Sequence, residues 1–474
     1  MIALQESCMG KFFGTDGIRG MANQYPMTVD VAMNTGRAIA HFVRQQQGTS
    51  AIIGRDTRRS GPMLEAALAA GLAAEGIDVH LAGVIPTPGV AFLAAHTPGA
   101  GAGIVISASH NPYQDNGIKL FRADGHKLSD EEEASVEIHL LALISTADHG
   151  YSAASDSQYA SVTPPPEPGL IQILDQARQK YVAFLKGCFS PNNAHNPTLT
   201  PMVVDCSNGA ASGVAEAVFS DLGLDVLFIH NMPDGRNINE RCGSQHTADL
   251  ATAVLAHKAR VGLAFDGDAD RLIAMDENGV PVTGDKILAI CACHAASRGE
   301  LPHKRVVSTV MSNIGLGIAL AAHGIAHEIT GVGDRLVMAA MEKNGIVMGG
   351  EDSGHMIFSQ YHTTGDGILT ALRLLTVMAE TGRSLSELAT VMTVYPQVLK
   401  NVEVHPDRPD FIAVESIHHA IESVENTLGE HGRVLVRYSG TQPLLRVMIE
   451  GPDQLQIENA CDYLCSVVRT EIGC

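Results

Sequence analysis

Residues 107–112, Ser-Ala-Ser-His-Asn-Pro, contain a serine whose surroundings suit nucleophilic chemistry. The preceding apolar residues 103–106 predict a short buried strand, and Asn111-Pro112 predicts the end of regular structure. Ser109 would therefore lie at a strand end, where a rigid element fixes its hydroxyl but leaves it open to solvent. Such a serine is a candidate nucleophile or phosphoryl carrier, although the same residue types also form plain turns.

A second polar segment follows the apolar stretch Val261–Phe265 and alternates carboxylates in a tight turn. Its aspartates are Asp266, Asp268 and Asp270. They could converge on one hard divalent cation, whose charge would offset their mutual repulsion. An EF-hand-like calcium loop is the alternative, because the aspartates and Glu277 have its spacing. Arg271 occupies the position of the required glycine, and a strand rather than a helix precedes the turn, which argues against that loop.

Four other segments combine glycines with hydroxyl, charged or imidazole side chains. They are Phe13–Gly20, Gly331–Arg335, Gly350–His355 and Arg437–Gln442. The last offers a guanidinium, two hydroxyls and close backbone N–H groups, which suit a dianionic phosphate. Gly350–His355 offers a carboxylate, a hydroxyl and an imidazole, which suit sugar hydroxyls and proton transfer. Each segment alone is common in turns, but their shared chemistry favours a functional site.

Three stretches share one order of elements: an apolar strand, a small-residue turn, an Ala-rich helix, a glycine and a second strand. They span residues 51–79, 202–226 and 306–327. Glycine after a helix is the usual left-handed cap, so each stretch predicts a βαβ-like unit, and together they predict three successive α/β domains. Residues 399–468 differ. They predict strands at 399–404, 433–437 and 444–450 with helices at 411–428 and 455–468, a small α+β domain with an antiparallel sheet.

Composition narrows the possible functions. The chain has 32 basic and 52 acidic residues and a net charge of −20, which argues against general nucleic-acid or anionic-membrane binding. With no apolar run of roughly 20 residues and no signal-peptide pattern, the predicted location is the cytoplasm.

The nine cysteines are too scattered for a disulfide framework, and Cys291–His294 predicts buried helix rather than a metal site. Residues 152–169, with the Pro-rich 163–168, predict a linker.

These motifs, in this order, resemble those of the α-D-phosphohexomutases, and within that family those of the bacterial phosphoglucosamine mutases. The resemblance covers nearly the whole chain and includes Asp115–Lys119 and Thr363–Gly367. It implies three α/β domains and a C-terminal α+β domain around a central cleft. The implied domains are 1–165 with a phosphoserine loop, 166–280 with a metal-binding loop, 281–393 with a sugar-binding loop, and 394–474 with a phosphate-binding loop.

The resemblance also implies residue roles. Ser109, which directly precedes His-Asn-Pro, would be the phosphoserine, with Ser107 as the structural alternative. A phosphoserine oxygen and the three aspartates would hold one Mg²⁺ per chain, which neutralises charge during phosphoryl transfer. The implied catalytic set is Ser109, Lys119, Arg271, His355 and Arg19. Lys119 and His355 are its proton-transfer candidates, and a phosphate clamp is the alternative role for Lys119.

The implied substrate ligands fall into two groups. Glu351, Ser353, Gly333 and Asp334 would contact the sugar, and Arg437, Ser439, Gly440 and Thr441 would clamp the phosphate that is not reacting. The family usually has glutamate where this chain has Gln442. The amide keeps the shape but loses a charge, so affinity for that phosphate or substrate preference could differ.

The implied activity interconverts glucosamine 6-phosphate and glucosamine 1-phosphate through a sugar 1,6-bisphosphate, which also serves as activator. It would feed amino-sugar nucleotide synthesis for cell-wall polymers. A phosphomannomutase or phosphoglucomutase is the alternative within the family. A catalytically silent binding or regulatory protein is the alternative outside it, against which the intact Ser109, aspartates and Arg271 argue. We expect a phosphosugar substrate, a homodimer, no nucleic-acid or membrane partner, and a hinge near residue 394.

Overall fold

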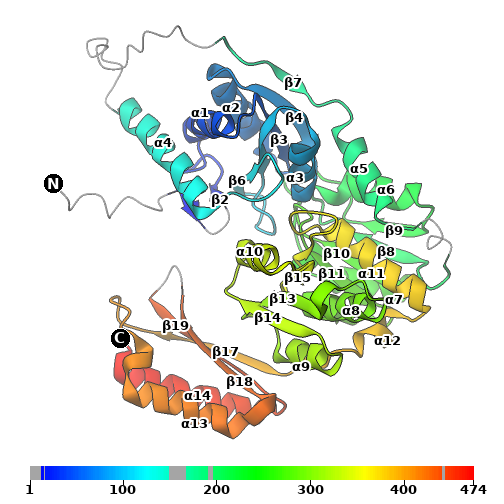
Figure 1. Cartoon of the computed structure of the whole chain (residues 1–474), viewed down its shortest axis with the longest axis vertical. Helices are drawn as coiled ribbons and strands as arrows, with labels where there is room; N and C mark the ends of the chain where they lie inside the picture. Colours follow the sequence, from blue (N-terminus) through cyan, green and yellow to red (C-terminus); the bar gives the residue numbers. More distant parts are fainter. Residues whose placement is uncertain (1–11, 15–16, 149–166, 191–195, 440–442) are drawn as a thin grey trace. The chain divides into compact units, whose positions relative to one another are not determined.

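The computed structural model describes residues 12–14, 17–148, 167–190, 196–439 and 443–474 (Figure 1). The chain divides into two compact units. The first contains Met1–Val310 and Ala326–Ala389, and the second contains Met311–Ile325 and Thr390–Cys474. Strands alternate with helices throughout the first unit, whereas the second ends in an antiparallel sheet with two long helices. The predicted sequence of α/β domains followed by an α+β domain is confirmed.

The first sheet of the larger unit has seven strands. In spatial order they are β1 (Phe13–Gly14), β2 (Gly17–Met21), β6 (Asp115–Arg122), β5 (Ala100–Ile106), β3 (Ser50–Arg55), β4 (Asp78–Val84) and β7 (Ile171–Ile173). Strands β3 and β5 are parallel and pair Arg55 with Ile106 at their carboxyl ends. The loops that follow them, beginning at Asp56 and Ser107, therefore emerge together at one edge of the sheet.

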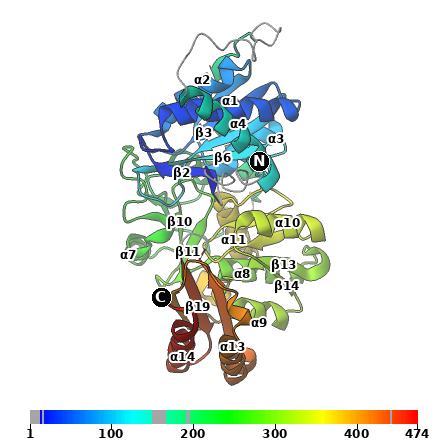
Figure 2. The same cartoon turned by 90° about the vertical axis from the view of Figure 1, so that its left-hand side faces the viewer.

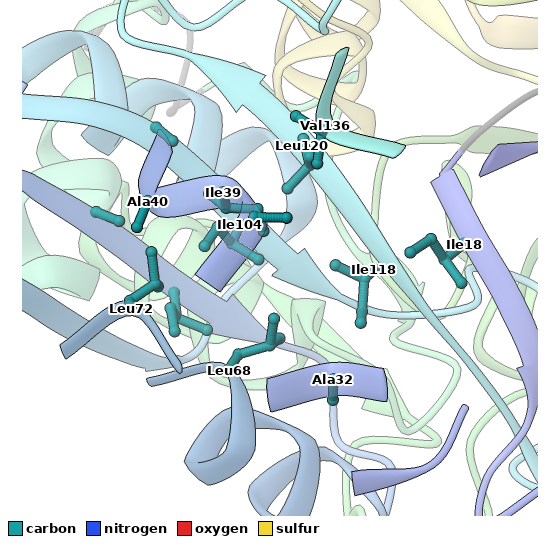
Figure 3. Close-up of a cluster of buried hydrophobic side chains, with 14 of the residues drawn as sticks. Ile18, Ala32, Ile39, Ala40, Leu68, Leu72, Ile104, Ile118, Leu120 and Val136 are labelled. Atoms are coloured by element: carbon teal, nitrogen blue, oxygen red, sulfur yellow. The ribbon is translucent and has the colours of Figure 1, made fainter. Parts of the chain in front are cut away.

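Helices cover both faces of this sheet. They are α1 (Val29–Gln45), α2 (Gly61–Ala74), α3 (Thr87–His96) and α4 (Asp130–Asp148). Helices α1, α2 and α4 share one core cluster with the strands, in which Ile39 and Leu68 pack with Ile104 (Figure 3). Val90 of α3 lies against the other face, where a Cβ atom at Gly54 or Gly103 would meet it. Because successive strand side chains alternate between faces, both helical layers bury apolar residues.

The second sheet has five strands, in the order β12 (Pro281–Val282), β11 (Leu272–Asp276), β10 (Val261–Phe265), β8 (Met202–Asp205) and β9 (Val226–Ile229). Its neighbouring helices are α5 (Ala177–Gly187), α6 (Ala211–Asp221) and α7 (Ala248–His257), with a short 3₁₀ helix η2 (Gly243–Gln245). Strands β10, β8 and β9 are parallel, so their carboxyl ends share one edge. The aspartate turn begins there, directly after Phe265.

The third sheet orders β14 (Ala326–Thr330), β13 (Arg305–Thr309), β15 (Met348–Gly350) and β16 (Met356–Phe358). Helices α8 (Gly284–Ser297), α10 (Asp334–Asn344), α11 (Gly367–Thr381) and α12 (Leu385–Ala389) belong to the same unit, as does η3 (Pro302–Lys304). Cys291 and Cys293 lie within α8, as predicted. The hairpin between β15 and β16 carries Glu351 to His355.

The second unit contains α9 (Ile314–Ala322) and a three-stranded antiparallel sheet. The sheet orders β17 (Gln397–Glu403), β19 (Leu444–Glu450) and β18 (Arg433–Tyr438). Its other elements are η4 (Phe411–Ala413), α13 (Glu415–Leu428), η5 (Gly429–His431) and α14 (Gln454–Ile472). Helices α13 and α14 lie side by side against this sheet (Figure 2), and Ile417, Val447 and Leu464 share their buried core. The predicted α+β tail is confirmed.

The three predicted βαβ-like stretches are also confirmed. Gly76, Gly223 and Gly324 follow α2, α6 and α9 with φ values of 79°, 71° and 66°, as expected of left-handed caps. Residues 152–166 of the predicted linker lie outside the described residues. None of the described helices is long and apolar enough to cross a membrane.

Close packing of α1 on α2 gives a testable prediction. A Cβ atom at Gly71 would overlap the backbone carbonyl of Met33, whereas one at Gly187 would meet no atom within 4 Å. We expect Gly71→Ala to lower the free energy of unfolding by about 1–3 kcal/mol through overpacking. Gly187→Ala, the matched control near the end of α5, should be neutral or stabilising by up to about 1 kcal/mol. Thermal midpoints of both variants test this, and equal midpoints would contradict it.

Candidate active site

Ser109 lies in the loop after β5 and is buried, with only 1% of its surface exposed. Its φ of 50° belongs to the left-handed region, which is uncommon for serine. The Ser109 Oγ donates a hydrogen bond of 2.6 Å to Asp266 Oδ2. The prediction that Ser109 is open to solvent is wrong. The aspartate turn packs directly over it, so closely that a Cβ atom at Gly267 would meet the Ser109 carbonyl oxygen at 2.5 Å.

A buried guanidinium fixes the backbone of the Ser109 loop. Arg58 is fully buried, and its Nε donates to Asp56 Oδ2 at 2.8 Å. Its terminal nitrogens donate to four carbonyl oxygens, those of Ser109, Asn111, Pro112 and Asp115. Ser107 Oγ donates to the same Asp56 oxygen at 2.6 Å and accepts from Ser109 N. Ser107 therefore links the Ser109 backbone to Asp56, while the Ser109 hydroxyl contacts the aspartate turn.

The three aspartates of the turn converge. Their nearest carboxylate oxygens lie within 4.8 Å of one another, and all three residues are buried: Asp266, Asp268 and Asp270. Oxygen Oδ2 of Asp268 accepts from Thr87 Oγ1 at 2.6 Å and from Lys119 Nζ at 2.9 Å. The Oδ1 atoms of Asp268 and Asp270 are buried without a hydrogen-bond partner. Buried carboxylate oxygens that lack a donor fit a hard divalent cation.

The alternative calcium loop does not form. Strand β11 follows Arg271 directly, and Glu277, the expected twelfth ligand, accepts hydrogen bonds from the backbone and hydroxyl of Ser386 instead. An EF-hand loop requires that glutamate to turn back onto the ion. The geometry therefore favours the three-aspartate arrangement alone.

Burial and crowding shape the charges of this cluster. Burial raises the pKa of Asp266 well above its usual range, and the neighbouring Asp270 and Asp268 add to the effect. Burial alone would also raise the pKa of Asp270, but Lys119, His355 and Arg271 outweigh it and hold that pKa low. Burial and crowding therefore disfavour the ionisation of all three carboxyls together, and a bound cation would favour it.

Cationic and imidazole groups surround the aspartates. Lys119 of β6 is 2% exposed, with Nζ 3.9 Å from Asp270 Oδ2 as well as close to Asp268. The Nη1 of Arg271 lies 3.3 Å from His110 Nδ1, next to Ser109. His355 is buried with Nδ1 3.5 Å from Asp270 Oδ2 and Nε2 3.4 Å from Asp334 Oδ2. Burial tends to lower the pKa of His355, but these two carboxylates raise it above its ordinary value.

A cavity of about 440 Å³ opens beside this cluster. Its lining includes Arg19, His110, Arg271, Glu351 and His355. Gly333 and Asp334 also line it, and Gly333 N donates to Glu351 Oε1 at 3.1 Å. The hydroxyl of Ser353, on the same hairpin as Glu351, is buried without a hydrogen-bond partner. The first unit therefore gathers the predicted catalytic residues and the predicted sugar ligands in one neighbourhood.

The predicted phosphate clamp belongs to the second unit. Its residues Gly440 and Thr441, and Gln442 after them, lie outside the described residues. Strands β18 and β19 pair Arg433 with Glu450, a complementary pair, but they pair Arg437 with Arg446. Burial and Arg446 lower the pKa of Arg437. Like charges on directly opposed residues are destabilising unless an anion neutralises them.

Several residues of the site escaped the sequence analysis. They are Asp56, Arg58, Thr87, His110, Lys127 and Asn239. Asn239 Nδ2 donates to the carbonyl oxygens of Ser109 and Asn111 at 2.8 and 2.9 Å, and Lys127 Nζ lies 2.6 Å from Asp334 Oδ2. One signal was present in the sequence: the charged run Arg55–Arg59 follows a buried strand directly. Such a run at a strand end marks the edge where functional loops gather.

Comparison with known proteins agrees with this geometry. The domain descriptions of the phosphoglucomutase/phosphomannomutase family match four stretches of the chain: alpha/beta/alpha domain I at residues 10–145, domain II at 179–279, domain III at 283–395 and the C-terminal domain at 399–466. The chain belongs to this family.

Curated relatives extend over the whole length. A phosphoglucosamine mutase of Desulforapulum autotrophicum is 57% identical and covers 97% of this chain and 99% of its own. Another phosphoglucosamine mutase, from Syntrophus aciditrophicus, is 48% identical and covers 98% of this chain and 100% of its own. Among solved structures, a phosphoglucomutase/phosphomannomutase family protein from Burkholderia thailandensis has a TM-score of 0.76 and 26% identity, with 96% of each chain covered.

The role of Arg58 can be tested directly. Arg58→Met leaves Asp56 as an unpaired buried carboxylate and four carbonyl oxygens without their donor, so we expect a loss of about 3–5 kcal/mol in unfolding free energy. Arg59→Met is the matched control, because Arg59 is next to Arg58 in the chain but its side chain is exposed. This change should alter the unfolding free energy by no more than about 0.5 kcal/mol. Denaturant unfolding compares them. A similar effect of both changes would refute the supporting role.

Proposed function

We propose that the chain is an isomerase that interconverts glucosamine 6-phosphate and glucosamine 1-phosphate. The observation that carries this proposal is the buried hydroxyl of Ser109, 2.6 Å from Asp266 in a cluster of three aspartates. The 57% identity to a phosphoglucosamine mutase supports the choice of sugar. The matched family and the arrangement of the cluster also support a phosphorylated sugar as the substrate class.

In the proposed reaction, Ser109 carries a phosphoryl group on Oγ. The free hydroxyl of the bound sugar phosphate attacks the phosphorus, the bond to Oγ breaks, and a sugar 1,6-bisphosphate forms. After the bisphosphate turns end for end, Ser109 Oγ attacks its other phosphoryl group and the isomeric monophosphate leaves. The same bisphosphate would act as activator by phosphorylating Ser109.

Asp266, Asp268, Asp270 and an oxygen on phosphorylated Ser109 would hold one Mg²⁺. When bound, this ion supplies positive charge that offsets the charge on the transferred phosphoryl group. The unpartnered carboxylate oxygens and the all-oxygen ligand set support this choice of metal. Arg271 and Arg19, which line the same cavity, would contribute further positive charge.

Lys119 and His355 are the proposed proton-transfer groups. The two carboxylates beside His355 favour its protonated form, which suits a proton donor to the leaving oxygen. Lys119 lies beside Asp268 and Asp270, and this pairing also suits its alternative role as a charge that steadies the phosphoryl group. The contact of Lys119 with Asp268 and the contact of His355 with Asp270 support these proposed roles.

The proposed sugar ligands are Glu351, Ser353, Gly333 and Asp334. Arg437, Ser439, Gly440 and Thr441 would bind the phosphate that is not reacting. The opposed Arg437 and Arg446, and the buried unpartnered Ser439 Oγ, support an anion site. We propose four functional loops on domains 1–165, 166–280, 281–393 and 394–474. The cytoplasm is the proposed compartment because a charged phosphosugar does not cross a lipid bilayer unaided. A homodimer and the hinge near residue 394 remain predictions.

Replacing the two serines of the loop separates their roles. Ser109→Ala removes the phosphoryl carrier, so we expect kcat to fall on the order of 10⁴-fold or more. The mass increase from a phosphate on the 107–112 loop should also disappear. Ser107→Ala removes only hydrogen bonds to Asp56 and the Ser109 backbone. It should keep the phosphate and lose less than about 100-fold in kcat. Assays with Mg²⁺ and bisphosphate activator, together with intact mass, provide the readout. Unchanged activity of Ser109→Ala would rule out the mechanism.

A comparison of three substrates tests the choice of sugar. Glucosamine phosphate carries a positively charged amino group, and the carboxylates of Glu351 and Asp334 line the cavity. We expect kcat/KM for glucosamine 6-phosphate to exceed that for mannose or glucose 6-phosphate by at least about tenfold, with Glu351→Gln narrowing this gap. A preference for mannose or glucose 6-phosphate would support the alternative mutases. No turnover of any of the three would support a silent homologue.

A further inference from the structure

A second group of potential metal ligands lies in the larger unit and shares no residue with the aspartate turn. Among the described residues, one atom each of Asp205, His230 and Cys242 lies within 4.8 Å of the others. Asp205 ends β8, and His230 directly follows β9, its parallel neighbour. Cys242 immediately precedes η2. Three separate loops thus bring a carboxylate, an imidazole and a thiol to one point.

The contact between Asp205 and His230 has the distance of a hydrogen bond but lacks its alignment. His230 Nδ1 lies 3.1 Å from Asp205 Oδ2, yet this buried nitrogen makes no hydrogen bond. Two ligands of one tetrahedral ion, each about 2.0–2.1 Å from it, are separated by about 3.3 Å. The observed separation is therefore close to that of two atoms that share an ion.

The surroundings orient these ligands. The other ring nitrogen of His230, Nε2, lies 3.4 Å from Asp249 Oδ2. Metal-binding histidines commonly direct their second nitrogen to a carboxylate, which fixes the ring and raises its basicity. Asp205 is held by the backbone N–H groups of Ser207 at 2.8 Å and Gly243 at 2.9 Å. Asp205 and Cys242 are almost completely buried, with exposures of 0% and 1%.

The backbone around this group is unusual. His230, Ser207 and Arg241 adopt positive φ values of 45°, 50° and 55°. Such conformations are uncommon outside glycine and persist where surrounding contacts hold them, often at ligand sites. These backbone conformations are consistent with a ligand at this point, in addition to the side-chain geometry.

We propose that Asp205, His230 and Cys242 form a binding site for a divalent transition metal, with Zn²⁺ as the natural ion. Imidazole and thiolate ligands favour Zn²⁺ over Mg²⁺, whereas the all-carboxylate turn has the opposite preference. On binding, the Cys242 thiol releases its proton to solvent, and the carboxylate and thiolate together balance the charge of the ion. Three protein ligands leave a fourth position for a water molecule.

A bound ion would stabilise loops that support the candidate active site. Asn239, three residues before Cys242, holds the carbonyl oxygens of Ser109 and Asn111. Thr57 Oγ1, from the other side, donates to the carbonyl oxygen of Asn208 at 2.6 Å. The ion would connect β8, β9 and the segment before η2, so its effect would reach Ser109 through positioning alone.

Cobalt spectroscopy on the metal-free full-length chain provides the test. Co²⁺ bound to a thiolate gives a sulfur-to-cobalt charge-transfer band, which a site made only of carboxylates cannot give. We expect about one equivalent of Co²⁺ to produce this band and Zn²⁺ to abolish it by displacement. Cys242→Ala should abolish the band. Cys291→Ala, which removes another buried cysteine in α8, should leave it unchanged.

A second variant guards against misfolding of Cys242→Ala. Asp249 is 63% exposed, so Asp249→Asn should fold normally and weaken Co²⁺ binding about 10–100-fold by removing the partner of His230. Absence of the band in the unaltered chain, or its survival in Cys242→Ala, would overturn the proposal and leave Asp205 and His230 as an ion pair. Unaltered Co²⁺ affinity in Asp249→Asn would also count against it. The readout is independent of mutase activity, so the two proposals can fail separately.

Discussion

The arrangement of the larger unit depends on one contact, the hydrogen bond from Ser109 to Asp266. The two residues come from loops on different sheets, and the contact places a hydroxyl against three buried carboxylates. Such a concentration of negative charge is unstable in a low-dielectric interior without compensation. Compensation comes from groups on separate elements: Lys119 on β6, Arg271 after the turn, and His355 between β15 and β16. The charge balance of the cluster therefore depends on residues from all three sheets of the larger unit.

Backbone strain is the second consequence of that contact. Ser109 and Ala269 both adopt left-handed conformations, with φ values of 50° and 58°, on the two loops that face each other. A serine in this region persists only if its surroundings hold it. Arg58 does so by binding four carbonyl oxygens of the Ser109 loop, and its own charge is balanced by Asp56. A buried arginine thus fixes the backbone that carries the Ser109 hydroxyl.

The sequence was sufficient to predict where strands end, but not which distant segments of the chain pack over those ends. The sequence predicted the tail strand β19 at Leu444–Glu450 with the bounds that the structure has. The exposure of Ser109 was predicted wrongly, because the turn that buries it is distant in sequence and no local pattern reports such packing. Arg58 was missed for a related reason: a buried arginine looks like an exposed one until the carbonyls that it binds are known.

The edge of the second sheet shows how one piece of secondary structure can offer two kinds of ion site. Parallel strands β10, β8 and β9 end side by side, so Asp266, Asp205 and His230 all emerge at that edge. Each loop then selects different partners. The turn after β10 adds only carboxylates, which suit a hard ion that must exchange contacts with a phosphoryl group. The loops after β8 and β9 meet Cys242, whose sulfur suits a softer ion held for support. If both proposed ions bind, the difference in ligand type would favour a different ion at each site.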